Sequence, residues 1–155
     1  MINQKGQSLV EALIALGAAA IVVSAVVIAV VTAQNNADFS KNQNRATQYS
    51  RQGMEILRQE SGTDWQTFSS YSGTYCLAGG STTLTASGGS SCSANISSFF
   101  VRSVTINQNS SACSGAAKVA VSTSWSDGKC NSQNQYCHNV TLDSCLADTS
   151  NVLSP

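Results

Sequence analysis

The chain has 155 residues, which is about the length of one domain. Charged residues make up 10% of it, well below the share of about 25% that is typical of soluble domains. The eight basic residues balance the eight acidic ones. Because there is no net positive field to attract phosphate, the composition does not favour direct binding to nucleic acid.

Residues 12–31 form an almost uniformly apolar segment, in which Ser24 is the one polar side chain. As a helix, a segment of this length spans about 30 Å, the hydrocarbon thickness of a bilayer. It is too long for the core of an ordinary secretory signal, and no small-x-small cleavage site follows it cleanly. We therefore expect a helix that crosses a membrane.

Glu11 lies inside the longer apolar run from Leu9 to Val31. A carboxylate at membrane depth costs about 2–4 kcal/mol on insertion scales. One interpretation is that Glu11 snorkels to the nearby interface, since it lies close to the end of the run. The other is that it meets a buried cation.

The sequence KGQSLVEALIAL, residues 5–16, resembles the class III signal of type IV pilins and pseudopilins. The resemblance implies that residues 1–6 are a leader, which a prepilin peptidase removes after Gly6. It also implies methylation of the new N-terminus at Gln7, where the family usually has phenylalanine. Glu11 is then the fifth residue of the mature chain. A plain signal-anchor helix explains the length of the segment but not the combination of Gly6 and Glu11.

The same resemblance implies a route from membrane to filament. Lys5 in the short leader favours an N-terminus on the inside of the cytoplasmic membrane. Residues 7–31 would be the transmembrane and polymerisation helix, and the amine of one subunit would meet Glu11 of its neighbour. The implied partners are other pilin subunits, the prepilin peptidase and an inner-membrane assembly platform. The final location would be an extracellular filament.

Residues 32–60 are predicted to continue the helix as an amphipathic segment, because no proline occurs before Pro155. Apolar or small residues recur there at helical spacing, at Phe39, Ala46, Tyr49, Gly53, Ile56 and Leu57. Gly53 costs about 1 kcal/mol relative to alanine, so we expect a sheet to approach the helix closely at this point. Gly62 is the predicted C-cap.

The remaining sequence predicts a small antiparallel sheet. Residues 61–98 read as a variable loop region anchored by Trp65 and Phe68, with short strands at residues 75–78 and 82–86. Residues 99–155 contain three segments that alternate apolar and polar side chains, namely 99–107, 118–125 and 138–146. The predicted fold class is α+β, pilin-like, with a long N-terminal helix packed on a sheet that disulfides cross-link.

Two further segments resemble minor pilins of the PilV kind. One is ATQYSRQGMEILR, residues 46–58, and the other is a strand that ends in WSDG before a loop and a final strand. This resemblance favours a minor rather than a major subunit.

Six cysteines all lie after residue 75, at Cys76, Cys92, Cys113, Cys130, Cys137 and Cys145. An even number in a Ser/Gly/Thr-rich region indicates disulfides formed outside the cytosol. There is no CxxC pair and His138 is the sole histidine, so disulfides are favoured over a metal site. Six cysteines allow 15 connectivities; our hypothesis pairs 76 with 92, 130 with 137, and 113 with 145.

No catalytic constellation is apparent, and we predict neither an enzyme nor a cofactor. Cys137 is expected to be oxidised, and neighbours in a strand point to opposite faces, which separates it from His138. Asp127 is explained by a turn. Two functions remain: a structural, minor subunit of a type IV pilus or pseudopilus, or a monomeric, membrane-anchored module for extracellular binding or adhesion.

Overall fold

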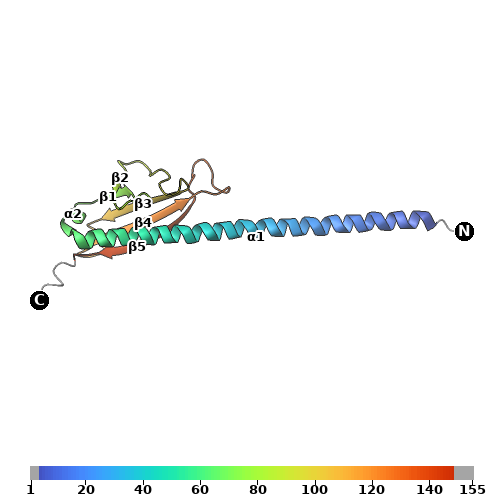
Figure 1. Cartoon of the computed structure of the whole chain (residues 1–155), viewed down its shortest axis with the longest axis horizontal. Helices are drawn as coiled ribbons and strands as arrows, with labels where there is room; N and C mark the ends of the chain where they lie inside the picture. Colours follow the sequence, from blue (N-terminus) through green and yellow to red (C-terminus); the bar gives the residue numbers. More distant parts are fainter. Residues whose placement is uncertain (1–3, 149–155) are drawn as a thin grey trace. The chain divides into compact units, whose positions relative to one another are not determined.

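The computed structural model describes the backbone of residues 4–148 and the side chains of residues 9–148. The chain divides after Lys41 into two compact units, an N-terminal unit and a C-terminal unit that we call the head. Helix α1, Gln4–Thr63, supplies the described part of the first unit and the first element of the head (Figure 1).

In the N-terminal unit two hydroxyl side chains bond to the backbone of their own helix. The Ser24 hydroxyl donates to the carbonyl of Ala20 at 2.8 Å, and the Thr32 hydroxyl donates to the carbonyl of Ile28 at 2.9 Å. Such bonds to the preceding turn give Ser24 and Thr32 a partner that an apolar environment does not offer. The segment is therefore suited to surroundings that offer no hydrogen bonds.

The head packs the C-terminal part of α1 on a five-stranded antiparallel sheet (Figure 1). Its other elements are α2, Trp65–Ser69; β1, Gly73–Cys76; β2, Thr85–Ala86; β3, Phe100–Asn107; β4, Ala117–Trp125; and β5, His138–Leu146. The strand order is β2-β1-β3-β4-β5. The α+β class, the long helix and the antiparallel sheet of the sequence prediction are thus confirmed.

The register places one apolar row across the sheet on its buried face. Val104 is opposite Val121, which in turn is opposite Leu142. Every second residue of β4 from Ala117 to Trp125 is buried, as the predicted alternation requires. Hydroxyls dominate the other face, where Ser103, Ser122 and Thr141 are in register and Thr141 donates to the Ser122 hydroxyl at 3.1 Å.

Gly53 marks a close approach of α1 to the sheet, as predicted. A Cβ atom on this residue would lie 2.9 Å from Cγ1 of Val121 and 3.2 Å from Cδ of Arg102. Ala46, Ser50, Met54 and Leu57 on the same side of α1 are buried. The prediction of the stripe omitted Ser50, whose hydroxyl donates to Oγ1 of Thr123 at 2.8 Å, and Met54. Phe39 belongs to the N-terminal unit.

The predicted helix end was wrong by three residues. Helix α1 continues to Thr63, so Gly62 lies inside it and is not a C-cap. The helical bonding continues because the Asp64 N–H donates to the carbonyl of Glu60 at 3.0 Å. Asp64 then caps α2, a helix that the sequence analysis did not predict, by accepting the Thr67 N–H at 3.0 Å. The fully buried Phe68 of α2 anchors this region on the core, as expected.

The first two strands also differ from their predicted bounds. Strand β1 starts at Gly73, opposite Ile106 of β3, and ends at Cys76. The two residues after it lie outside the strand, and their carbonyls accept hydrogen bonds from the Arg102 side chain. The Leu77 N–H still donates to the backbone carbonyl of Arg102 at 3.2 Å. Strand β2 is limited to Thr85–Ala86. Pairing with β3, which the local pattern could not reveal, sets the register of β1.

Three disulfides join the loops of the head to the sheet. Cys76–Cys92 ties the end of β1 to the loop before β3, Cys113–Cys145 ties the β3–β4 loop to β5, and Cys130–Cys137 closes the β4–β5 loop. These are the three pairs of the sequence hypothesis. All six cysteines are oxidised, which is consistent with folding outside a reducing compartment.

Candidate functional site

The first candidate site is the apolar surface of the N-terminal unit. Its aliphatic side chains are exposed throughout residues 9–31, with Ile21 73% and Val31 48% exposed. A window of this helix reaches a mean hydropathy of 2.9, and none of that window is buried within the chain. By length and composition the helix is able to cross a membrane.

Glu11 interrupts this surface with a single carboxylate. Its side chain is exposed and its neighbours in sequence, Val10 and Ala12, are exposed as well. Gly6 and Gln7 lie in the backbone of α1, in a stretch whose side chains are outside the described residues. Gln7 and Glu11 are four residues apart in α1.

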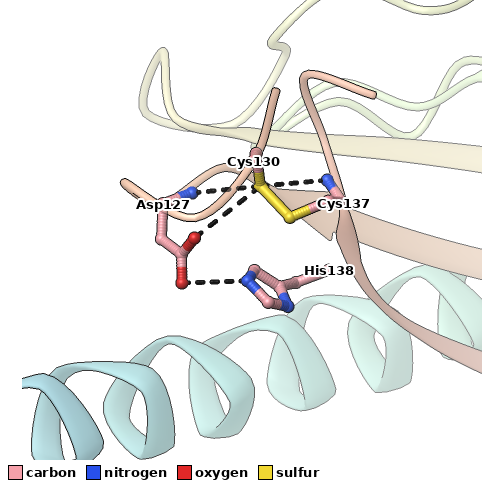
Figure 2. Close-up of side chains that lie close together, drawn as sticks. All are labelled: Asp127, Cys130, Cys137 and His138. Carbon is pink, nitrogen blue, oxygen red and sulfur yellow. Dashed lines mark hydrogen bonds and ion pairs between the residues drawn. A yellow bond between two sulfur atoms is a disulfide. The ribbon is translucent and has the colours of Figure 1, made fainter. Parts of the chain in front are cut away.

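The second candidate site is a cluster in the β4–β5 loop, which we call the loop cluster: Asp127, Cys130, Cys137 and His138 (Figure 2). One possible metal-ligating atom from each of these four residues lies within 4.8 Å of the others. Nε2 of His138 lies 2.9 Å from Oδ2 of Asp127, and Oδ1 of Asp127 lies 3.8 Å from Sγ of Cys130. All four side chains are half-buried.

The local turn explains why these side chains converge. The Cys130 N–H donates to the Asp127 carbonyl at 3.2 Å, and the Lys129 N–H donates to Oδ1 of Asp127 at 2.8 Å. At the other end of the loop, the ring of His138 stacks on Trp125 with centroids 5.4 Å apart. Since Trp125 and His138 are paired residues of β4 and β5, the sheet fixes the position of the imidazole.

Backbone donors stabilise charge in this cluster. The hydrogen bond from the Lys129 N–H, assisted by a smaller contribution from His138, holds the pKa of Asp127 below its usual value. Sγ of Cys130 accepts two backbone N–H groups, from Asp127 at 3.4 Å and from Cys137 at 3.3 Å (Figure 2). The loop therefore favours negative charge on the Asp127 carboxylate and presents two N–H donors to the disulfide sulfur of Cys130.

Cys137 and His138 were expected to point to opposite faces, as neighbours in one strand do, but they lie close together in the structure. Strand β5 begins at His138, so Cys137 lies outside the strand and is free of this alternation. Asp127 was explained by the turn alone, and no spacing motif revealed that its carboxylate faces the imidazole.

A third feature is a groove on the hydroxyl-rich side of the sheet. It has a volume of about 660 Å³ and lies between the loop closed by Cys76–Cys92 and the β4–β5 loop. Its lining consists mostly of hydroxyl and amide side chains from these loops and from β3 and β4, among them Ser103, Ser124, Asn134 and Tyr136. The lining contains no charged side chain among the described residues.

Arg102 is a buried residue that the sequence analysis did not single out. Its side chain is 0% exposed and donates to the carbonyls of Leu77 at 3.0 Å, Ala78 at 2.9 Å and Tyr49 at 3.0 Å. Burial lowers the pKa of Arg102 from its ordinary value. The guanidinium joins α1, β3 and the loop after β1, so its role is to hold the head together.

Comparison of the chain with protein-family models, with curated proteins and with solved structures finds no match.

Proposed function

We propose that the chain is a structural subunit, and specifically a minor subunit, of a type IV pilus or pseudopilus. In this proposal a prepilin peptidase removes residues 1–6 on the cytoplasmic face of the membrane. The mature chain is anchored in the cytoplasmic membrane with its head outside. It then assembles into an extracellular filament through contacts of its N-terminal helix. The partners are other pilin subunits and the assembly platform in the inner membrane.

The observation that carries the proposal is the exposed aliphatic surface of residues 9–31 with one carboxylate in it. Nothing in the described chain buries this surface, so lipid or neighbouring helices must cover it. An acid at that depth is best stabilised by a cation. Cleavage after Gly6 would create an amine at Gln7, and in a filament the amine of one subunit can reach Glu11 of the next.

Small residues in the same helix suit contact between helices. Gly17 has no atom within 4 Å of the position that its Cβ would take, and Ala18, Ala19 and Ala20 follow it. In membranes, small side chains allow helices to approach closely. This favours a helix that first lies in lipid and later packs against other subunits.

The decisive experiment is the mass of the mature N-terminus after coexpression with a prepilin peptidase. We expect the loss of residues 1–6 and a methylated Gln7. The Gly6→Val variant should stay uncleaved, whereas Gly17→Val, a matched change within the same helix, should be processed normally. An intact Met1 in the wild-type chain, in the presence of an active peptidase, would contradict the proposal.

A second experiment isolates the carboxylate. Glu11→Ala should reduce incorporation into filaments at least tenfold, because about 1.4 kcal/mol of lost pairing energy corresponds to that factor. Glu55→Ala, which removes an exposed carboxylate from the head, is the control and should incorporate like the wild type. Equal incorporation of the two variants would remove the role given to Glu11.

The alternative function, a monomeric membrane-anchored module for binding or adhesion, is favoured by the neutral polar groove. A groove of about 660 Å³ is within the size range of small-ligand sites. This alternative requires an uncleaved leader and predicts that Glu11→Ala has no effect. The two experiments above therefore separate the two functions.

A further inference from the structure

The loop cluster contains the donor set of a tetrahedral metal site. Cysteine sulfur, histidine nitrogen and aspartate oxygen are all ligands of Zn²⁺, and a set with two sulfurs and tetrahedral geometry is typical of zinc. Within residues 9–148, no other group of three or more possible ligands comes together in this way. The Cys130–Cys137 disulfide, however, occupies both sulfurs.

We propose that the loop cluster binds a zinc-like divalent cation when its disulfide is reduced, so that disulfide and metal are mutually exclusive states of the same loop. A dithiol reductant would supply two electrons and two protons, which convert the disulfide to two thiols while the dithiol becomes a disulfide. Binding of the cation would then release the two thiol protons and form two metal–sulfur bonds. His138 and Asp127 would complete the coordination.

The distances require little movement. In a tetrahedral zinc site the two sulfurs lie about 3.8 Å apart, and a nitrogen and an oxygen ligand lie about 3.3 Å apart. Nε2 of His138 and Oδ2 of Asp127 are already 2.9 Å apart. The Cα atoms of Cys130 and Cys137 are 5.4 Å apart, so opening of the disulfide moves mainly the two sulfur atoms.

The surroundings support charged ligands. The two backbone N–H groups that Sγ of Cys130 accepts would stabilise a thiolate. The Lys129 N–H holds the Asp127 carboxylate, and stacking on Trp125 holds the imidazole of His138. Two of the four ligands, Asp127 and His138, are thus oriented by residues outside the loop cluster, which is the usual role of a second shell, and Cys130 is oriented by backbone N–H groups of the cluster itself.

The first test uses the full chain in detergent micelles and Co²⁺ as the probe. Graded reduction, followed by alkylation and mass spectrometry, identifies a condition under which Cys130–Cys137 is open. We expect one Co²⁺ per reduced chain, a sulfur-to-cobalt charge-transfer band, and displacement by Zn²⁺. The oxidised chain should show neither the band nor tight binding. A reduced loop that binds no Co²⁺ would overturn the proposal.

A second test avoids reduction and leaves the other two disulfides closed. Cys137→Ser frees Cys130 beside His138 and Asp127, and should bind one Co²⁺ with the charge-transfer band. Adding His138→Asn to this variant should weaken binding at least tenfold, within the range of about 10–100-fold seen when a single supporting group is lost. If Cys137→Ser does not fold, the same measurement is made on Cys130→Ser, which frees Cys137 instead.

The matched control is Cys113→Ser. It also frees one thiol, Cys145, by opening a disulfide, but that thiol does not belong to the loop cluster. This control should bind Co²⁺ no better than the oxidised wild type. If it binds as well as Cys137→Ser, the metal recognises free thiols in general and the proposed site is wrong. None of these outcomes depends on filament assembly.

Discussion

The N-terminal unit and the head use the same aliphatic residues in opposite ways. Ile21 is 73% exposed, whereas Val104 and Val121 in the head are 0% exposed. Burying a side chain of this kind contributes about 1.5–3 kcal/mol. The head obtains that energy from its own core, and the N-terminal helix obtains it only from lipid or from other molecules.

The two units also differ in how they satisfy polar groups. In the N-terminal helix, Ser24 and Thr32 donate to carbonyls four residues earlier. In the head, Arg102 bonds to Tyr49, which is 53 residues away in sequence. The helix is therefore built from local interactions, while the head depends on long-range ones. Substitutions should accordingly separate into those that change membrane insertion and those that change the stability of the head.

The largest expected effect on the head is that of Arg102→Ala. It would leave a cavity and deprive three carbonyls of a donor, so we expect the free energy of unfolding to fall by about 3–5 kcal/mol. Urea denaturation of the full chain in micelles, followed by tryptophan fluorescence, measures this change. Arg51→Ala removes an exposed arginine from the part of α1 that belongs to the head. Its free energy of unfolding should stay within about 0.5 kcal/mol of the wild-type value. Equal effects of the two variants would contradict the role of Arg102.

Part of the role of Arg102 could have been predicted from the sequence. The segment 99–107 was predicted to be an alternating strand, and the alternation that places Phe100, Val104 and Ile106 on one face also places residue 102 on that face. What the pattern cannot supply is the set of acceptors. Two of them come from an irregular segment after β1, whose course is set by tertiary contacts and not by local propensity.

The next effect distinguishes the disulfides by the length of chain that they close. Cys113–Cys145 spans 32 residues and Cys130–Cys137 spans 7. In the chain-entropy model, replacing the longer pair by serines costs about 4 kcal/mol and replacing the shorter pair costs about 2 kcal/mol. Denaturation of the two double-serine variants measures the difference. The reverse order would show that native contacts, and not loop closure, decide the contribution of these bonds.

The third prediction concerns the N-terminal unit. Ile21→Lys places a charge in the middle of the apolar run. It should make the free energy of membrane insertion less favourable by about 3 kcal/mol. The unfolding midpoint of the head should be unchanged, because residue 21 belongs to the other unit. Glycosylation-site mapping in membranes measures insertion. Asn36→Lys, outside the run, is the control, and a loss of head stability in Ile21→Lys would break the distinction between the units.

A smaller effect is expected from Gly53→Ala. The added methyl group gains about 1 kcal/mol in helix propensity, but it would contact Val121 at 2.9 Å, and such crowding typically costs 1–3 kcal/mol. We expect a net loss of about 1 kcal/mol in the free energy of unfolding. A Cβ atom at Gly62 would have no other atom within 4 Å, so Gly62→Ala should stabilise the head. Stabilisation by both variants would show that the sheet moves enough at Gly53 to relieve the contact with Val121.

The loop cluster could be predicted from the sequence only in part. The strand His138–Leu146 was predicted with its observed bounds, and the pairing of Cys130 with Cys137 was among the hypotheses. The approach of Asp127 to His138 depends on the conformation of a loop of 12 residues, 126–137, between β4 and β5. Side chains that meet across such a loop leave no periodic signal, so their proximity appears only in three dimensions.

The smallest effect is a pH dependence confined to the head. Hydrogen bonds from the side chain and the backbone of Thr67 hold the pKa of Asp64 below its ordinary value of 3.8. Because the folded-state pKa is depressed, the contribution of Asp64 is fully present above the unfolded value and is lost as the pH falls through the folded value. Asp64→Asn keeps a capping oxygen but does not titrate, so its stability should fall less steeply than that of the wild type below pH 3.8. Denaturation at a series of acidic pH values tests this, and parallel curves for the two proteins would show that other carboxylates control the acid sensitivity of the head.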